Sequence, residues 1–354
     1  MRTVVLEDIP ALARGAAVLG TGGGGDPYIG ALLAEATIRE HGPISLAAVD
    51  DLDDDSVVLP VAMMGAPTVM VEKVPTIDQV SAAVETLAGY LGKKPTHIAC
   101  IEAGGVNSTI PFVAAAQLGL PLVDGDFMGR AFPELQMVIP SLYGIRATPM
   151  TIMDEKGNRG VLDTISNRWA ETLARSATID MGCSAIVSLY AMDGEQARKS
   201  YVPGTLSACI DIGSAIQTAQ KEHRDAVQAV VAAVGGRKLF AGKITDLERK
   251  TETGFARGIV TIAGFGGHEG AVMRLYIQNE ILIAEIDGAT EVTTPDLIMA
   301  LDIETGEPIT TESLRYGARI AVIASPADER WHTEEGIALV GPRYFGYDTE
   351  PVRV

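Results

Sequence analysis

The sequence predicts a two-domain α/β protein, with an N-terminal three-layer α/β domain built on a mostly parallel sheet and a C-terminal β-rich, barrel-like domain. In roughly the first 150 of the 354 residues, continuous apolar runs of strand length alternate with helical runs, which is typical of parallel strands buried on both faces. Short alternating segments separated by turn residues dominate later and indicate a barrel or small sandwich. We place the boundary at residue 165, so that the domains cover 1–165 and 166–354. The chain is 47% hydrophobic and 21% charged, which is sufficient for two cores.

Local signals define the helices and strands of the first domain. Asp8 and the pair Asp26–Pro27 each begin a helix, because an acidic N-cap followed closely by proline suits a first helical turn. Gly20 ends the first of these helices, and Thr76 with Gln79 forms a capping box that begins another. The predicted helices cover 8–20, 26–40, 76–91 and 108–118, and the predicted strands cover 56–63, 97–101 and 120–123.

Turn residues separate the segments that follow. The sequence Glu-Lys-Gly-Asn at 155–158 predicts a hairpin between strands at 150–153 and 160–163. One long helix is expected from about 205 to 234. Further short strands, whose regular spacing favours the barrel-like domain, are predicted at 258–262, 271–277, 281–286, 297–301 and 319–323.

The charge balance excludes several classes of partner. The chain has 28 Lys and Arg against 46 Asp and Glu, a formal net charge of −18, whereas binding to nucleic acid depends on basic residues that neutralise phosphates. We therefore expect no nucleic-acid partner and no docking on an anionic membrane. Neither the N-terminus nor any apolar run has the pattern of a signal peptide or a membrane span. Three widely spaced cysteines predict reduced thiols and a cytoplasmic location.

Four consecutive glycines, Gly22, Gly23, Gly24 and Gly25, precede Asp26. A phosphate-binding turn should follow a strand and open a helix, but these glycines follow a helix, lack a Lys-Ser/Thr pair and lead to a carboxylate at the helix start. No nucleotide is therefore expected. Two interpretations stay open: a turn between two helices, or a backbone wall that lets a ligand approach closely.

Three carboxylates follow the predicted strands. Glu102 comes after one strand, and Asp124 and Asp126 come after the next. Ligands of open α/β sheets bind beyond the carboxyl ends of the strands, so these side chains are candidate catalytic groups in one crevice. Paired carboxylates with different pKa values can act as general acid and base. Alternatively, they hold a divalent metal ion, or they serve only as turn and cap residues. The five histidines show no close metal-binding spacing.

Candidate substrate-binding groups surround these carboxylates. The backbone at Gly104 and Gly105 opens a helix whose N–H groups suit a developing oxyanion, and Asn107 adds an amide beside it. Arg130 is a nearby cation, and its alternative role is a structural ion pair with Glu102. The glycines at 22–25 and Asp26 complete the predicted site.

Motifs distributed over nearly the whole chain occur in a fixed order. They are Leu19-Gly20-Thr21 through Asp26-Pro27, Glu102-Ala103-Gly104-Gly105, Leu122-Val123-Asp124-Gly125-Asp126 with Gly129-Arg130-Ala131 and Pro133-Glu134, Gly242-Lys243 through Gly254-Phe255-Ala256-Arg257-Gly258, and Gly341-Pro342-Arg343 with Phe345-Gly346-Tyr347-Asp348. Together they resemble the S-methyl thiohydantoin desulfurase family, whose members are often encoded beside, or fused to, hydantoinase/oxoprolinase proteins. The resemblance implies the same combination of an α/β and a β-rich domain.

The resemblance also implies a hydantoin-like small-molecule substrate and hydrolytic removal of the sulfur substituent from a thiohydantoin ring, which leaves a hydantoin. For this reaction we assign Asp124 or Asp126 as base or metal ligand, and Glu102 and Asn107 as groups that orient the ring. The rival interpretation is a non-catalytic ligand-binding or scaffold subunit of a hydantoinase/oxoprolinase-type enzyme. A homo-oligomer is a further expectation. An anionic substrate would need a local cation, for which the candidates are Arg130, Lys243, Arg257 and Arg343.

Overall fold

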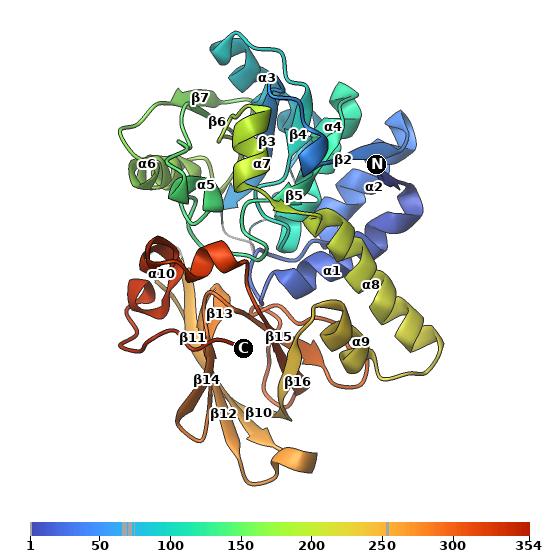
Figure 1. The fold of residues 1–354 in the computed structure, drawn as a ribbon, viewed down its shortest axis with the longest axis vertical. Helices are drawn as coiled ribbons and strands as arrows, with labels where there is room; N and C mark the ends of the chain where they lie inside the picture. Colours follow the sequence, from blue (N-terminus) through green and yellow to red (C-terminus); the bar gives the residue numbers. More distant parts are fainter. Residues whose placement is uncertain (1, 66–68, 70–72, 74, 253–254) are drawn as a thin grey trace.

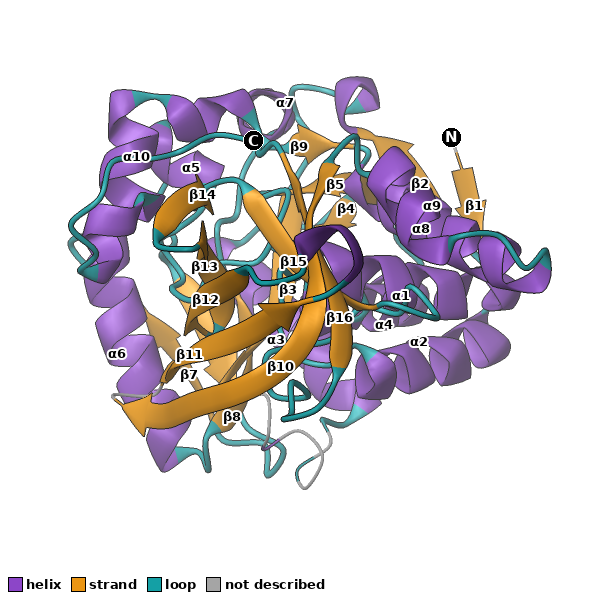
Figure 2. Ribbon diagram, turned by 90° about the horizontal axis from the view of Figure 1, so that it is seen from below, coloured by secondary structure: helices purple, strands orange, loops and turns teal. Residues whose placement is uncertain are grey.

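The computed structural model describes residues 2–65, 69, 73, 75–252 and 255–354. Two sheets of different kinds organise the molecule. The strands of the first lie among helices, and the strands of the second form a curved surface at the other end (Figures 1 and 2). The predicted α/β class with a β-rich, barrel-like second part is confirmed.

The centre of the first sheet is parallel. Its four central strands lie in the order β2, β5, β4, β3, and antiparallel strands extend the sheet at both edges. All residues from Val58 to Met64 in β3 are buried, without the alternation of a one-sided sheet, so both faces of this strand are covered, as its apolar run predicts. The strands are β1 (Arg2–Val4), β2 (Ile44–Ala48), β3 (Val58–Gly65), β4 (His97–Ala99), β5 (Leu122–Asp126), β6 (Met150–Met153), β7 (Arg159–Leu162), β8 (Ser184–Ser188) and β9 (Val202–Pro203).

The helices of the first part begin and end where the predicted signals stand. Gly20 is the C-cap of α1, and Oδ1 of Asp26 accepts a hydrogen bond from the N–H of Tyr28, the first residue of α2. Oγ1 of Thr76 accepts from the N–H of Gln79 at 3.2 Å, which forms the predicted capping box of α3. The α-helices are α1 (Ile9–Leu19), α2 (Tyr28–His41), α3 (Ile77–Leu91), α4 (Ile110–Leu118), α5 (Ile139–Leu142), α6 (Asn167–Asp180), α7 (Gly194–Ser200), α8 (Thr205–Lys221), α9 (Ala226–Ala233) and α10 (Glu334–Val340).

The second sheet is antiparallel and curls into a half-barrel. Its strands lie in the order β14, β13, β12, β11, β10, β16, β15. The curvature is most visible in β10, which bends across Figure 2. The strands are β10 (Arg237–Glu252), β11 (Phe255–Gly264), β12 (Val272–Gln278), β13 (Glu280–Ile286), β14 (Ala289–Thr293), β15 (Leu297–Asp302) and β16 (Arg319–Ser325).

Several elements differ from the sequence-based expectation. The helix expected from 205 to 234 is two helices, α8 and α9, because the chain turns at His223 with a positive φ of 53°. The hairpin of β6 and β7, by contrast, is formed as predicted and extends the first sheet, where β6 pairs with β8. Helix α6 and strands β8, β10 and β14 were not predicted. From Asp246 onward β10 pairs with β11 but not with β16, which flanks its first half. This second half is more exposed, so it can be rich in charged residues.

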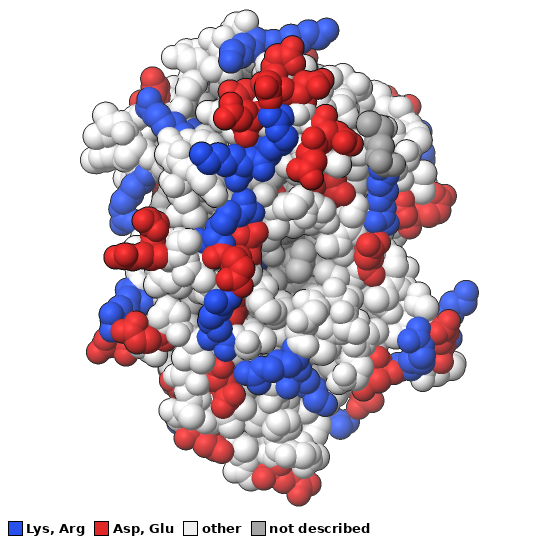
Figure 3. Space-filling model, viewed as in Figure 1, with Lys and Arg blue, Asp and Glu red and all other residues white. Residues whose placement is uncertain are grey.

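The two sheets share a core. Ile283, Met299 and Ile323 of the second sheet pack into the same buried cluster as the first sheet and its helices. Val260 and Leu275 belong to a separate cluster enclosed by the half-barrel. No helix in the described part of the chain has the length and apolarity needed to cross a membrane. On the face shown in Figure 3, Lys and Arg are interspersed with Asp and Glu.

Candidate active site

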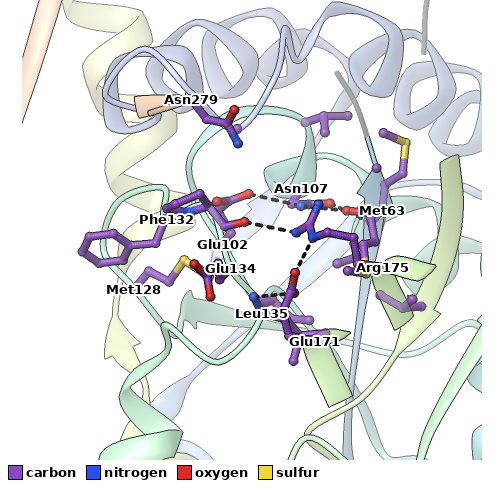
Figure 4. Close-up of a pocket in the computed structure, with 18 of the residues that line it drawn as sticks. Met63, Glu102, Asn107, Met128, Phe132, Glu134, Leu135, Glu171, Arg175 and Asn279 are labelled. Atoms are coloured by element: carbon purple, nitrogen blue, oxygen red, sulfur yellow. Dashed lines mark hydrogen bonds and ion pairs between the residues drawn. The ribbon is translucent and has the colours of Figure 1, made fainter. Parts of the chain in front are cut away.

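A cavity of about 120 Å³ lies where the two sheets meet, beyond the carboxyl ends of β3 and β4 (Figure 4). Its volume is well below the roughly 300–1000 Å³ of pockets that hold drug-sized ligands, so it suits a small ring better than a nucleotide. Residues from both domains form its walls: Gly24, Ala62, Met63, Met64, Gly65, Ile101, Glu102, Val106, Asn107, Met128, Phe132, Pro133, Glu134, Leu135, Glu171, Arg175, Val187, Leu189, Asn279 and Glu280.

Asn107 connects the end of β3 to Glu102. Its Oδ1 accepts from the N–H of Met63 at 2.8 Å, and its Nδ2 donates to the carbonyl of Met63 at 3.2 Å and to Oε2 of Glu102 at 3.1 Å. These three bonds determine which way the amide is oriented. Asn107 and Glu102, both predicted from the strand ends, therefore face one cavity as a connected pair.

Glu280 enters the cavity from the second domain. It is the first residue of β13 and directly follows Asn279, whose positive φ of 58° forms a one-residue turn from β12. Glu280 is 2% exposed, and its Oε2 has no hydrogen-bond partner among the described residues. Burial raises the pKa of Glu280 to about 8, while the charge of Arg130 opposes the rise. A buried carboxyl oxygen without a partner is available to a bound molecule.

Glu102 and Glu280 experience different electrostatic environments. Burial raises the pKa of Glu102 well above its usual range, and a charge on Glu280 raises it further. Arg130, by contrast, favours the ionised form of Glu280. Glu280 therefore loses its proton first, and its charge then keeps Glu102 protonated. Two carboxyl groups with separated pKa values can supply a base and an acid to one substrate.

The opposite side of the cavity contains an ion pair. Nε of Arg175 contacts Oε1 of Glu171, whose Oε2 accepts from the N–H of Leu135 at 3.0 Å (Figure 4). The Arg175 guanidinium also donates to the carbonyl of Pro133 at 3.3 Å and lies 4.9 Å from the ring centroid of Phe255. These contacts hold Arg175 in place and neutralise its charge locally.

Two family models together cover nearly all of the chain. Residues 7–164 match the model described as S-Me-THD-like, N-terminal domain, and residues 165–354 match S-Me-THD-like, C-terminal domain. The chain belongs to the S-Me-THD-like family. The resemblance to the S-methyl thiohydantoin desulfurase family that the motifs indicate is thereby confirmed.

A solved structure has the fold of this S-Me-THD-like chain. It is an X-ray crystal structure of a protein from Chromobacterium violaceum, with a TM-score of 0.84 over 100% of both chains at 22% sequence identity. At this identity the likeness concerns the fold alone. No curated protein matches the sequence.

The two aspartates predicted as catalytic in this S-Me-THD-like protein do not line the cavity. Both oxygens of Asp124 bind Ser207 near the start of α8, with the N–H at 3.0 Å and Oγ at 2.6 Å. Asp126 is fully buried and accepts from the N–H groups of Ala103, Met128 and Gly129. Burial raises the pKa of Asp126 to about 6, although these hydrogen bonds oppose the rise. Of the predicted carboxylates, only Glu102 reaches the cavity.

The glycine-rich turn connects three parts of the fold. The carbonyls of Thr21 and Gly22 accept from the N–H groups of Ile281 and Thr311 at 2.8 and 2.7 Å, so the turn is bonded to the second domain. The Gly24 carbonyl accepts from the N–H of Val106 at 2.9 Å. Only Gly24 of this turn lines the cavity. The predicted wall is thus restricted to one glycine, and the exposed Asp26 instead accepts from the N–H of Tyr28 beside Pro27, the N-cap of α2.

Gly104 and Gly105 face the glycine-rich turn. A Cβ on Gly105 would lie 2.2 Å from the Gly24 carbonyl oxygen, and one on Gly24 would lie 2.6 Å from that of Gly104. These glycines are therefore required for close backbone packing. Neither Gly104 nor Gly105 belongs to the cavity wall, and Gly22, Gly23 and Gly25 are also outside it.

Arg130 is fully buried beside the cavity and holds the two domains together. Its guanidinium donates to the carbonyls of Pro295 and Asp296 at 2.7 and 2.8 Å and to Oγ1 of Thr21 at 3.0 Å, and it lies 4.4 Å from the ring centroid of Phe132. Burial lowers the pKa of Arg130 to about 10, so it stays charged at neutral pH. The predicted ion pair with Glu102 is not formed, although the charge of Arg130 acts on that carboxyl group and on Glu280.

The sequence did not single out Glu280, Glu171 or Arg175 as site residues. Glu280 lies between the strands predicted at 271–277 and 281–286, where a glutamate is usually solvated. Glu171 and Arg175 lie on α6, which was not predicted. As for a metal, no three His, Cys, Asp or Glu side chains in the described ranges are arranged to hold an ion.

Proposed function

We propose that this protein hydrolyses an S-methyl thiohydantoin-like ring to the corresponding hydantoin and a free thiol. The observation that carries the proposal is the pair Glu102 and Glu280, two buried carboxyl groups with different surroundings in one small cavity. Membership of the S-Me-THD-like family supports a thiohydantoin-related substrate.

The reaction needs one base and one acid. Ionised Glu280 takes a proton from water as the water oxygen attacks the ring carbon that bears sulfur, and protonated Glu102 donates a proton to the adjacent ring nitrogen. This gives a tetrahedral carbon that carries both a hydroxyl and the sulfur substituent. The carbon–sulfur bond then breaks: Glu280 returns its proton to sulfur, and Glu102 accepts the hydroxyl proton as the carbonyl forms. The sum is ring plus water giving hydantoin plus thiol, with both carboxyl groups restored.

Asn107 is a positioning residue in this scheme. Its Nδ2 holds Oε2 of Glu102, and its bonds to both backbone groups of Met63 fix the amide against the end of β3. The other oxygen of Glu102 is then oriented by a rigid strand rather than by a loop. The cavity wall of Met63, Met128 and Phe132 supplies an apolar surface for a flat ring.

The direct test is thiol release by the purified protein from an S-methyl thiohydantoin, with the hydantoin product analysed by mass spectrometry in ¹⁸O water. We expect one labelled oxygen per product and a rate at least about 100-fold lower in Glu280→Gln and in Glu102→Gln. Glu195→Gln, an exposed glutamate in α7, is the matched control for loss of one carboxyl group. Absence of thiol release by the wild-type protein, alone and with a hydantoinase/oxoprolinase-type protein, would exclude the proposal.

A second candidate is a non-catalytic subunit, and the exposed side of α6 favours it. Trp169 and Leu173 of α6 are 50% and 43% exposed and lie four residues apart, which places them on one face, and Ile165, just before the N-cap Ser166, is 88% exposed. Glu171 and Arg175 of the cavity lie on about the opposite side of the helix. Thiol release only after addition of a hydantoinase/oxoprolinase-type protein, with loss of complex formation in a Trp169→Ser, Leu173→Ser double variant, would support this candidate. A dimer of the isolated chain that this double variant abolishes would instead assign the face to a second copy.

A further inference from the structure

Asn279 of the cavity wall carries an amide donor that makes no hydrogen bond to any described residue. We propose that its Nδ2 donates a hydrogen bond to the carbonyl oxygen of the substrate ring, the oxygen that is present before and after the reaction. Asn279 would then select rings that contain a lactam-type carbonyl and stabilise the charge that forms on that oxygen. The inference rests on the function proposed above, because it takes a thiohydantoin-type ring to be the substrate.

Strand β11 determines the orientation of the Asn279 amide. Oδ1 of Asn279 accepts from the N–H of Ala256 at 2.9 Å, and the backbone N–H of Asn279 donates to the carbonyl of Ala256 at 2.8 Å. The side-chain atom that faces an N–H donor must be the oxygen, so the other atom is Nδ2. Nδ2 is not among the buried atoms that lack a partner, so it is accessible to a bound molecule. In Figure 4 the nitrogen of Asn279 is turned toward the side of the cavity that holds Glu102 and Asn107.

The backbone of Asn279 is held on both sides. Its φ of 58° is left-handed, a conformation that asparagine adopts more readily than most residues. Its carbonyl accepts from Oγ1 of Thr311 at 2.6 Å, and the N–H of Thr311 donates to the carbonyl of Gly22 at 2.7 Å. Asn279 is therefore fixed between β11 and a segment bonded to the glycine-rich turn. A donor that is fixed before the ligand arrives loses little freedom on binding.

The amide of Asn107, which also lines the cavity, has no donor left for a ligand. Its Nδ2 donates to the carbonyl of Met63 at 3.2 Å and to Oε2 of Glu102 at 3.1 Å, which uses both of its N–H bonds. Asn279, in contrast, keeps its donor and immediately precedes Glu280 in the chain. The turn between β12 and β13 thus presents an amide donor and the proposed base side by side.

The proposed reaction places negative charge on the ring carbonyl. When water attacks the carbon that bears sulfur, the electron pair of the carbon–nitrogen double bond moves to the ring nitrogen that Glu102 protonates. Where that nitrogen is bonded to the ring carbonyl, part of the charge spreads to the carbonyl oxygen until the proton arrives. A donor held at this oxygen stabilises the transition state more than the bound substrate.

The test compares, by calorimetry, the binding of hydantoin and of ethyleneurea, the five-membered cyclic urea that lacks the second carbonyl of hydantoin. Asn279→Gly retains the left-handed turn, and Asn279→Asp retains the acceptor for Ala256 but replaces Nδ2 by an oxygen. We expect the wild-type protein to prefer hydantoin, and this preference to fall at least about fivefold in both variants. Gln228→Glu makes the same amide-to-carboxylate exchange at an exposed position of α9 and should retain the preference.

In turnover, Asn279→Gly should lower kcat at least about tenfold with a smaller rise in KM, because the hydrogen bond strengthens as charge forms on the oxygen. Equal binding of the two rings by the wild-type protein, or no binding of hydantoin, would overturn the inference. A preference that survives in folded Asn279→Gly would overturn the role of Asn279 and assign the ring carbonyl to another donor, such as Arg175. The calorimetry involves no turnover, so Asn279-dependent binding of hydantoin without thiol release would retain this contact and reject the desulfurase activity.

Discussion

The backbone of Gly23 packs against the side chain of Glu280. A Cβ placed on Gly23 would be 2.1 Å from Oε1, 2.5 Å from Cδ and 2.7 Å from Cγ of that glutamate. The glycine-rich turn of the first domain thus determines where the carboxyl group of the second domain can lie. This contact relates the most conspicuous motif of the sequence to the cavity, although Gly23 itself is outside the cavity wall.

Replacing Gly23 by alanine is therefore expected to displace Glu280 and to lower thiol release at least about tenfold, since a misplaced catalytic group loses rate steeply. The backbone of Gly23 does not have a positive φ, so the added methyl group should act through Glu280 rather than through backbone strain. Gly89→Ala is the matched control. It lies in α3 with open space around its Cβ and should stabilise the protein by up to about 1 kcal/mol without changing the rate. Equal rates of thiol release by the two variants would show that the contact between Gly23 and Glu280 does not affect the reaction.

The rate of thiol release should depend on pH through Glu280. If Glu280 is the base, it acts only when ionised, so the rate should rise with pH through its pKa of about 8 and fall again at the higher pH where Glu102, the acid, loses its proton. Arg130 favours that ionisation, and Arg130→Met should therefore move the rising limb to higher pH in any folded fraction. The measurement is kcat/KM from pH 5 to 10. A wild-type profile that is flat across this range would exclude Glu280 as the base.

Stability should fall as pH rises across the range in which folded and unfolded Glu280 differ. The pKa of Glu280 is raised from 4.5 to about 8 in the folded protein, so the folded state retains a proton that the unfolded chain releases. The contribution of this proton is complete below about pH 4.5 and is lost by about pH 8. Thermal melting in a pH series should show a smaller decrease for Glu280→Gln than for the wild-type protein. Parallel curves would mean that burial does not keep the carboxyl group of Glu280 protonated in the folded protein.

Asp124 and Asp126 should affect stability more than turnover. Asp126 accepts three backbone N–H bonds, and asparagine offers only one side-chain oxygen, so Asp126→Asn should destabilise the protein by about 1–3 kcal/mol. Asp124→Asn retains one acceptor for Ser207 and should melt close to wild type with most of its activity. Chemical denaturation and thiol release on the same preparations separate the effects. A folded Asp124→Asn variant that has lost 100-fold or more in rate would restore this residue as a catalytic group.

Arg130 should be essential for the attachment of the two domains. Arg130→Met removes the donors for the carbonyls of Pro295 and Asp296 inside the core, and we expect a loss of several kcal/mol in the free energy of unfolding. Arg224→Met is the control, because that side chain is 59% exposed and pairs with Glu222 at the surface. Its effect should be within about 0.5 kcal/mol.

Much of the fold follows from local patterns. The buried run that becomes β3, the capping box at Thr76 and the hairpin of β6 and β7 are defined by residues close in sequence, so their positions could be predicted. Helix α6 has a serine N-cap at Ser166 but follows directly on a hairpin, and its buried face consists of small and polar residues, Ala170, Glu171, Ala174 and Thr178. Strand β10 has a charged second half, unlike the apolar runs of the predicted strands. The motif pattern was sufficient to establish the family.

The sequence by itself determined the two-part architecture, the family, and the presence of Glu102 and Asn107 at the end of a strand. Only the tertiary structure decided which carboxyl group joins them. Asp124 and Asp126 lie within the neighbouring strand β5, and backbone N–H groups and Ser207 occupy their oxygens. Glu280 lies 178 positions after Glu102 in the chain and reaches the cavity because β13 starts against the glycine-rich turn. Burial, which raises the pKa of Glu280, results from the packing of two domains and has no local signature in the sequence.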